Sequence, residues 1–201
     1  MSIARIAVLV SGGGTNLQAL INAQEKGIIK SGKIELVISN KPDVFALERA
    51  QKANIKTAVV TKVNGNKEQF EQDIIDLLEK ESIDIIVLAG FMVILSESFT
   101  KRYPKRIINV HPSLIPSFCG EGFYGLKVHE AALAYGVKVT GATVHFVNEI
   151  PDGGEIIMQK AVNILKNDTP ETLQKRVMRL AEWQILPRAV EKVSADIISK
   201  K

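Results

Sequence analysis

Cysteine is nearly absent from this sequence, and histidine is scarce. The 201 residues include one cysteine, Cys119, which excludes an internal disulfide and a cysteine-based metal site. The three histidines, His111, His129 and His145, do not stand at the i, i+4 spacing of a helical zinc site. We therefore predict that the protein uses no metal.

Long hydrophobic stretches are also missing. No apolar run reaches the roughly 18 residues that a membrane-spanning helix needs. The N-terminal residues lack the layout of a secretory signal. We expect a cytoplasmic protein with no membrane partner.

The charge balance has no strong excess of one sign. Lys and Arg number 26 against 22 for Asp and Glu, which gives a formal net charge of +4. The lysines are scattered, and no basic stripe is interleaved with aromatic residues, so we predict no nucleic-acid partner. A mildly basic surface explains the balance, and it also suits an anionic small-molecule substrate. With 46% hydrophobic and 24% charged residues, the composition is that of one globular domain over residues 1–201.

Short apolar runs rich in Val and Ile recur along the first half of the chain. They do not alternate with polar residues, which indicates strands buried on both faces, as in a parallel sheet. The predicted strands are Ile6–Val10, Ile34–Ile38, Thr57–Val60, Ile83–Leu88 and Arg106–Val110. The predicted helices between them are Asn16–Lys26, Val44–Ala53 and Lys67–Lys80. This alternation predicts an α/β fold with a doubly wound, mostly parallel open sheet of Rossmann-like type.

The pattern changes after Val110. Residues 111–125 are rich in Gly and Pro, which predicts a long ordered loop, and a helix is expected around Val128–Tyr135. Two further strands, Val139–Val147 and Glu155–Val162, are joined by a Gly-rich turn that favours an antiparallel pair. Residues 169–193 predict a terminal helix that begins at Thr-Pro-Glu and is broken or kinked at Pro187.

A glycine loop follows the first strand and precedes the first helix. Gly12, Gly13 and Gly14 allow close approach of the backbone to a ligand, and the helix N-terminus at Thr15 and Asn16 favours an anion. A tight strand-to-helix turn explains the glycines about as well. The G-x-G-x-x-G spacing is broken at position 17, and the lysine of a P-loop is missing, so a single phosphate fits better than a dinucleotide.

Polar side chains lie at the end of the fifth predicted strand and in the turn that precedes the seventh predicted strand. Asn109 and His111 stand two residues apart, so in a strand both point to one side, and an amide beside an imidazole suits a reaction that develops an oxyanion. Alone, this pair is better explained by hydrogen bonds to the following loop. Asp152 lies in an Asp-Gly turn, and its spacing cannot bring it to His111. His129 is expected to be exposed on its helix, and His145 to make a structural hydrogen bond, with a site contact as the alternative.

Several stretches, spread in order over nearly the whole chain, together resemble the glycinamide ribonucleotide formyltransferase family. The matching stretches are Val10–Gln18, Ile38–Lys41, Val87–Met92, Asn109–Pro116, Thr143–Val147 and Asp152–Gly154. The Asn-x-His-Pro-Ser-Leu element is shared with other formyltransferases, whereas the Ser-Gly-x-Gly-Thr-Asn loop narrows the match to this family. The resemblance implies transfer of a formyl group from 10-formyltetrahydrofolate to the amine of glycinamide ribonucleotide in purine synthesis.

The resemblance also implies roles for single residues. Asn109, His111 and Asp152 form the implied catalytic trio, with Asp152 favouring a charged His111. The residues implied to bind the ribonucleotide are Gly12 and Gly13, which shape the loop, Gly14, Thr15 and Asn16 at the phosphate, and Glu182 at the ribose. The residues implied to bind the folate are Lys67, Phe91, Met92, Val93, Ile94, Leu95, Asn109 and Val147.

Some positions depart from the family pattern. Val93 and Lys67 stand where relatives often have Arg, the loop Ser117–Gly125 is longer than usual, and the helix that carries Glu182 holds one extra residue. The alternatives are another formyltetrahydrofolate-dependent formyltransferase or hydrolase, which would need further domains, a non-catalytic nucleotide-binding module, and a nicotinamide-dependent oxidoreductase. We expect a monomer or a weak homodimer.

Overall fold

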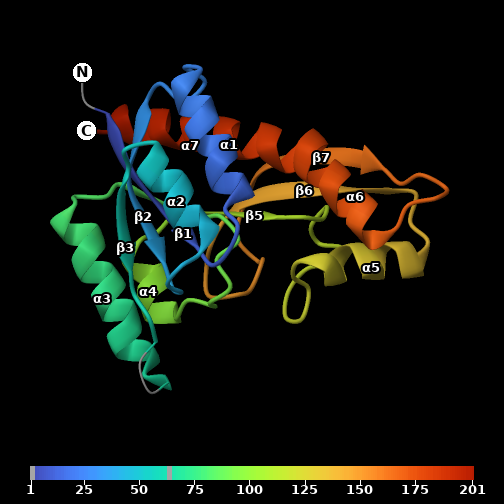
Figure 1. The fold of residues 1–201 in the computed structure, drawn as a ribbon, viewed down its shortest axis with the longest axis horizontal. Coiled ribbons are helices and arrows are strands. Elements are labelled where there is room, and N and C mark those ends of the chain that lie inside the picture. The colour runs from blue at the N-terminus through green and yellow to red at the C-terminus, as the bar shows by residue number, and fades with distance from the viewer. Residues whose placement is uncertain (1–2, 63–64) are drawn as a thin grey trace.

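The computed structural model describes residues 3–62 and 65–201 and contains one seven-stranded sheet (Figure 1). The strands are β1 (Ala4–Val10), β2 (Gly32–Ser39), β3 (Lys56–Val59), β4 (Ile85–Leu88), β5 (Ile107–His111), β6 (Val139–Phe146) and β7 (Ile156–Asn163). Their order is β3-β2-β1-β4-β5-β6-β7, and the pairs among β1 to β5 are parallel. β6 runs antiparallel to both β5 and β7. The predicted mostly parallel sheet with an antiparallel strand pair is confirmed, and the β5–β6 pairing adds a second antiparallel contact.

Helices cover both faces of the sheet. They are α1 (Thr15–Glu25), α2 (Phe45–Lys52), α3 (Lys67–Lys80), α4 (Glu97–Arg102), α5 (Leu126–Tyr135), α6 (Pro170–Val177) and α7 (Trp183–Ile198). Alternate residues of β1 enter two cores, with Ile6 and Val8 packed on the side of α1, α2 and α7, and Ala7 and Leu9 on the side of α3 and α4. Burial on both faces explains why this strand shows no polar alternation.

The C-terminal helical segment departs from the prediction. It begins as expected, with Pro170 in the first turn and Thr169 as a side-chain cap. The irregularity lies at η2 (Met178–Glu182), a π-helical turn between α6 and α7, and Pro187 lies inside α7. A π turn holds an extra residue. It is therefore the feature that would accommodate the extra residue predicted for the helix that carries Glu182.

The sheet order reverses direction between β1 and β4, because β2 and β3 lie to one side of β1 and β4 and β5 to the other. In open α/β sheets, ligands bind outside the carboxyl ends of the strands at such a switch point. The segments that follow β1, β4 and β5 therefore share one edge, as the sequence predicts. Within the residues that the structure describes, no helix combines the length and apolar character needed to cross a membrane.

Candidate active site

The glycine loop after β1 is held through its own backbone atoms. The Gly12 carbonyl accepts a hydrogen bond from Ala46 N at 3.1 Å, and the Gly13 carbonyl accepts one from Arg49 Nε at 2.8 Å. Gly14 has φ 70, and a Cβ there would lie 2.7 Å from the Ala46 Cβ. α1 begins directly after Gly14, which has no side chain to cap it. The first N–H groups of α1 are therefore free to bind an anion.

Asn16 pairs with Glu182 below this loop. Asn16 Nδ2 donates to Glu182 Oε2 at 2.8 Å, and both residues are buried. Burial raises the pKa of Glu182 to about 7, against the lowering effect of the Asn16 bond. Because the Asn16 amide is directed at Glu182, its backbone N–H is the group that faces the anion site. The family resemblance implies separate substrate groups for these two residues, the phosphate and the ribose, and the structure joins them by a hydrogen bond.

The polar residues at the end of β5 meet Asp152 in one cluster. Asp152 Oδ2 lies 3.4 Å from His111 Nδ1, and Asp152 Oδ1 lies 3.4 Å from Asn109 Nδ2. Asn109 Nδ2 also lies 3.2 Å from His145 Nε2, and His145 Nδ1 lies 2.8 Å from the Phe146 carbonyl. The structure therefore brings the three implied catalytic residues together. His145, for which a structural hydrogen bond was expected, makes one and also contacts the cluster.

The turn between β6 and β7 delivers Asp152 to the cluster through tight backbone packing. Asp152 itself has φ 55. A Cβ on Gly153 would lie 2.7 Å from the Ile150 Cβ, and one on Gly154 would lie 1.8 Å from the Phe146 carbonyl oxygen. Glycine is thus sterically required at both positions. The Asp-Gly-Gly sequence that reads as an ordinary turn is what folds Asp152 back over the ends of β5 and β6.

The loop after β5 covers the cluster. His111 Nε2 lies 2.8 Å from the Phe118 carbonyl, and Gly120 N donates to Asp152 Oδ2 at 2.9 Å. The loop base is fixed as well, because Ser113 Oγ donates to the Ser117 carbonyl at 2.6 Å. Since a carbonyl only accepts hydrogen bonds, Nε2 of His111 carries the proton. In the neutral ring Nδ1 is then a lone pair that faces the Asp152 carboxylate.

Burial and nearby charges act in opposite directions on the pKa values of this cluster. Burial lowers the pKa of His111 and outweighs the raising effects of the Asp152 charge and the Phe118 carbonyl. Burial also raises the pKa of Asp152, but the contact with His145, the His111 charge and the Gly120 N–H outweigh it and leave that pKa below its ordinary value. The predicted effect of Asp152, which raises the pKa of His111, is present, but the removal of the ring from water by the loop outweighs it.

The segment after β4 forms an apolar surface beside the cluster. Met92 is 53% exposed and Ile94 is 60% exposed, and Phe91, Val93 and Val147 pack partly buried against the core. Leu95 is 7% exposed and belongs to that core. The segment is tied to the glycine loop, because Met92 N donates to Ser11 Oγ at 2.9 Å. An exposed surface of this kind suits a flat, largely apolar ligand.

Lys67 reaches the same segment through Glu71. Its Nζ lies 3.8 Å from Glu71 Oε1, and that carboxylate oxygen accepts from Ser96 N at 2.7 Å. Lys67 thus stands near the outer end of the apolar surface rather than against it. Its predicted contact with the folate stays a prediction.

His129 is buried, and the expectation that it is exposed is wrong. It is 0% exposed, on the face of α5 that also buries Val128 and Ala132. Neither ring nitrogen has a hydrogen-bond partner among the described residues, and burial lowers its pKa to about 4. The i, i+3 spacing with Ala132 is the signal in the sequence that could have indicated burial.

Two residues of the site were not predicted at all. Arg49 and Trp183 carry no motif, and each becomes notable only in space. Arg49 holds the glycine loop, as described above, and Trp183 directly follows Glu182, with 37% of its surface exposed.

Comparisons with known proteins agree with this geometry. Residues 4–190 match the formyl transferase family. The phosphoribosylglycinamide formyltransferase of Haemophilus influenzae is 43% identical over 188 residues, which cover 93% of this chain and 85% of that protein. The crystal structure of phosphoribosylglycinamide formyltransferase from Brucella melitensis superposes with a TM-score of 0.87 at 40% identity, covering 96% of this chain and 97% of that one.

A longer relative matches over a part of its length. The trifunctional purine biosynthetic protein adenosine-3 of Homo sapiens is 46% identical over 196 residues, yet the match spans 19% of that protein. This chain thus covers about a fifth of the vertebrate relatives of that name. The family predicted from the sequence is confirmed: the chain belongs to the formyl transferase family and, within it, to the phosphoribosylglycinamide formyltransferases.

Proposed function

We propose that this chain transfers the formyl group of 10-formyltetrahydrofolate to the amine of glycinamide ribonucleotide. The observation that carries the proposal is the Asp152 carboxylate, 3.4 Å from both His111 Nδ1 and Asn109 Nδ2, at the sheet edge that also carries the glycine loop. A non-catalytic nucleotide-binding module would need the loop but not the cluster. An oxidoreductase would need a dinucleotide fingerprint, which the loop lacks.

The ribonucleotide and the folate approach the cluster from two sides. The phosphate binds the free N–H groups at the start of α1, shaped by Gly12 to Asn16, and Glu182 lies one hydrogen bond away at Asn16 to receive ribose hydroxyls. The pterin rests on the apolar surface of Phe91 to Ile94, with Val147 beside it. This arrangement holds the amine and the formyl carbon together at Asn109, and proximity supplies much of the rate.

The reaction needs one proton to move from the amine to the folate. The amine nitrogen attacks the formyl carbon, the carbonyl oxygen becomes an oxyanion, and the bond between that carbon and the folate nitrogen then breaks. Asn109 stabilises the oxyanion by giving up its 3.4 Å contact with Asp152, which is long for a hydrogen bond.

With a neutral imidazole and an ionised carboxylate, the His111–Asp152 pair can accept one proton. The lone pair of His111 Nδ1 and the Asp152 oxygen both accept, so the proton that leaves the attacking amine binds between them. His111 then delivers a proton to the departing folate nitrogen. The imidazole is therefore the group that holds the proton between its removal from the amine and its transfer to the folate nitrogen.

Turnover of the purified chain tests this function. Formyl-folate and glycinamide ribonucleotide are supplied together, and the folate product is followed by its absorbance. His111→Ala is expected to lower kcat by roughly 10²–10⁴-fold with ribonucleotide affinity retained by calorimetry. Lys192→Ala, on the exposed side of α7, serves as the control. Near-normal turnover of the His111 variant would contradict the proposed role.

The compartment and the assembly stay predictions. A cytoplasmic enzyme that works as a monomer or weak homodimer, with these small molecules as partners, agrees with a site built within one chain.

A further inference from the structure

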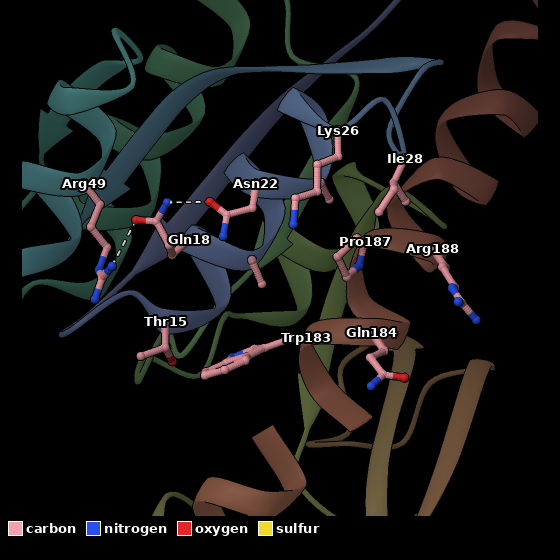
Figure 2. A pocket seen from close by; sticks show the side chains of 12 residues that line it. Thr15, Gln18, Asn22, Lys26, Ile28, Arg49, Trp183, Gln184, Pro187 and Arg188 are labelled. Carbon is pink, nitrogen blue, oxygen red and sulfur yellow. Dashed lines mark hydrogen bonds between the residues drawn. The ribbon is translucent and has the colours of Figure 1, made fainter. Parts of the chain in front are cut away.

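A groove separate from the catalytic cluster runs between α1 and the start of α7 (Figure 2). Its volume is about 380 Å³. Its lining includes none of Asn109, His111 and Asp152, and it begins at Thr15, the first residue of α1. The groove therefore adjoins the glycine loop from the outside of the sheet edge. Its volume lies in the range of small-molecule sites.

The groove is cationic. Lys26, Arg49 and Arg188 line it, and no Asp or Glu does. Over residues 3–62 and 65–201, none of these three side chains forms an ion pair. Three unpaired cations around one hollow favour an anionic ligand.

One of these cations is fixed in place. Arg49 Nε donates to the Gly13 carbonyl at 2.8 Å, and its guanidinium donates to Gln18 Oε1 at 3.0 Å (Figure 2). Its guanidinium carbon also lies 4.6 Å from the centre of the Phe45 ring. Arg49 is therefore a fixed contact between the groove and the glycine loop.

The floor of the groove is aromatic. Trp183 is 37% exposed, and its ring lies between Thr15 and Gln184 in Figure 2. Above the ring, the amides of Gln18 and Asn22 are joined at 2.9 Å and leave donors and acceptors at the groove wall. A flat face for stacking beside amide groups is what a nucleobase needs, and such stacking contributes roughly 1–3 kcal/mol per base.

We propose that this groove binds a nucleoside phosphate, with the base on Trp183 and the phosphate toward Lys26 and Arg188. We further infer that its occupancy weakens ribonucleotide binding. Arg49 lines the groove and also binds the Gly13 carbonyl of the glycine loop. Trp183 lines the groove and directly follows Glu182, the residue proposed to bind the ribose. The groove and the ribonucleotide site are therefore connected at two points. The second inference rests on the proposed function, and the first does not.

Fluorescence gives a direct test, because Trp183 is the only tryptophan in the chain. AMP, GMP and ATP are titrated into the purified protein, and quenching of tryptophan emission is expected to saturate. The double variant Lys26→Glu/Arg188→Glu should weaken nucleotide binding at least about tenfold and leave turnover without nucleotide unchanged. Lys192→Glu reverses the same charge on α7 outside the groove and should bind nucleotide like the parent protein.

Calorimetry separates the groove from the substrate site. The affinity for glycinamide ribonucleotide should fall several-fold in saturating AMP, and by the same factor AMP affinity should fall in saturating ribonucleotide. Absence of binding at roughly millimolar nucleotide, or binding that the double variant leaves unchanged, would overturn the proposal. If the parent protein bound nucleotide in the groove but had no formyltransferase turnover, the proposed function would be contradicted and the proposed nucleotide site would stand.

Discussion

The glycine loop and the catalytic cluster lie on one sheet edge but are built from different parts of the chain. The loop binds through backbone groups, and its side chains are absent or, as in Asn16, turned inward. The cluster consists of side chains from β5, β6 and the turn before β7. The parallel half of the sheet thus provides recognition by the main chain, and the antiparallel half provides chemistry. Substitutions in the two halves should therefore change different kinetic constants.

The largest effect is expected for Asp152→Asn. The amide keeps the shape of the carboxylate but cannot receive the proton that leaves the amine. We expect kcat to fall by roughly 10²–10⁴-fold, with ribonucleotide affinity nearly unchanged in calorimetry. A variant that instead raised KM at normal kcat would mean that Asp152 binds substrate, and the contrast between the two halves would fail.

Gly14→Ala should act on the other half. The new Cβ would meet Ala46 in a left-handed backbone, which should cost about 2–4 kcal/mol of unfolding free energy and raise KM for the ribonucleotide. Gly27→Ala is the matched control, because Gly27 has φ 66 but open space around it. Urea unfolding and steady-state kinetics of both variants measure the effect. Equal losses in the two would show that backbone strain alone is responsible.

His129 should make stability depend on pH from within the antiparallel half. Its pKa is about 4 in the native state against 6.5 ordinarily, so between these values the unfolded chain binds more protons. The free energy of unfolding should therefore fall by about 3 kcal/mol as pH drops from 6.5 to 4. His129→Leu should remove this loss in urea titrations at several pH values. A variant that kept the full decline would show that other groups cause it.

Glu182, which lies beneath the glycine loop, should make the free energy of unfolding change with pH in the opposite direction. Its pKa is about 7 in the native state against 4.5 ordinarily, so the native state holds a proton that the unfolded chain releases. The free energy of unfolding should therefore fall as pH rises from 4.5 to 7.

The pH ranges in which His129 and Glu182 affect the free energy of unfolding overlap, and their effects have opposite signs. The free energy of unfolding of the parent protein should therefore change little between pH 4.5 and 6.5, which is the smallest effect predicted here. Glu182→Gln should remove the opposing slope and make stability rise with pH there. If Glu182→Gln instead followed the parent curve over this range, the two slopes would not be opposing each other.

The two halves also differ in how far the sequence predicts them. The strands of the parallel half, the helix Lys67–Lys80 and the glycine loop follow from patterns within short windows. The meeting of His111 with Asp152 does not, because it depends on a turn whose two glycines must pack against Phe146 and Ile150. The lowered pKa of His111 depends on a loop that covers it, and no spacing encodes that cover.

His129 and Trp183 show the same limit in single residues. His129 of α5 was expected at the surface because polar residues are usually exposed, although the apolar Ala132 three residues later indicated a buried face. Trp183 gains its place in a groove from the packing of α1 against α7, which are far apart in the chain. Helix existence could be predicted, but the side that a helix presents to a distant helix could not.

The π turn at η2 determines the direction in which the side chains of α7 point. One residue of an α-helix corresponds to about 100° of rotation, so removing one residue from Met178–Glu182 would turn Glu182 away from Asn16 or turn α7 away from the sheet. A single-residue deletion there and a single-residue insertion are therefore not equivalent changes. The extra residue acts as a fixed angular offset that lets one continuous helical segment serve a buried carboxylate and a core-facing helix at the same time.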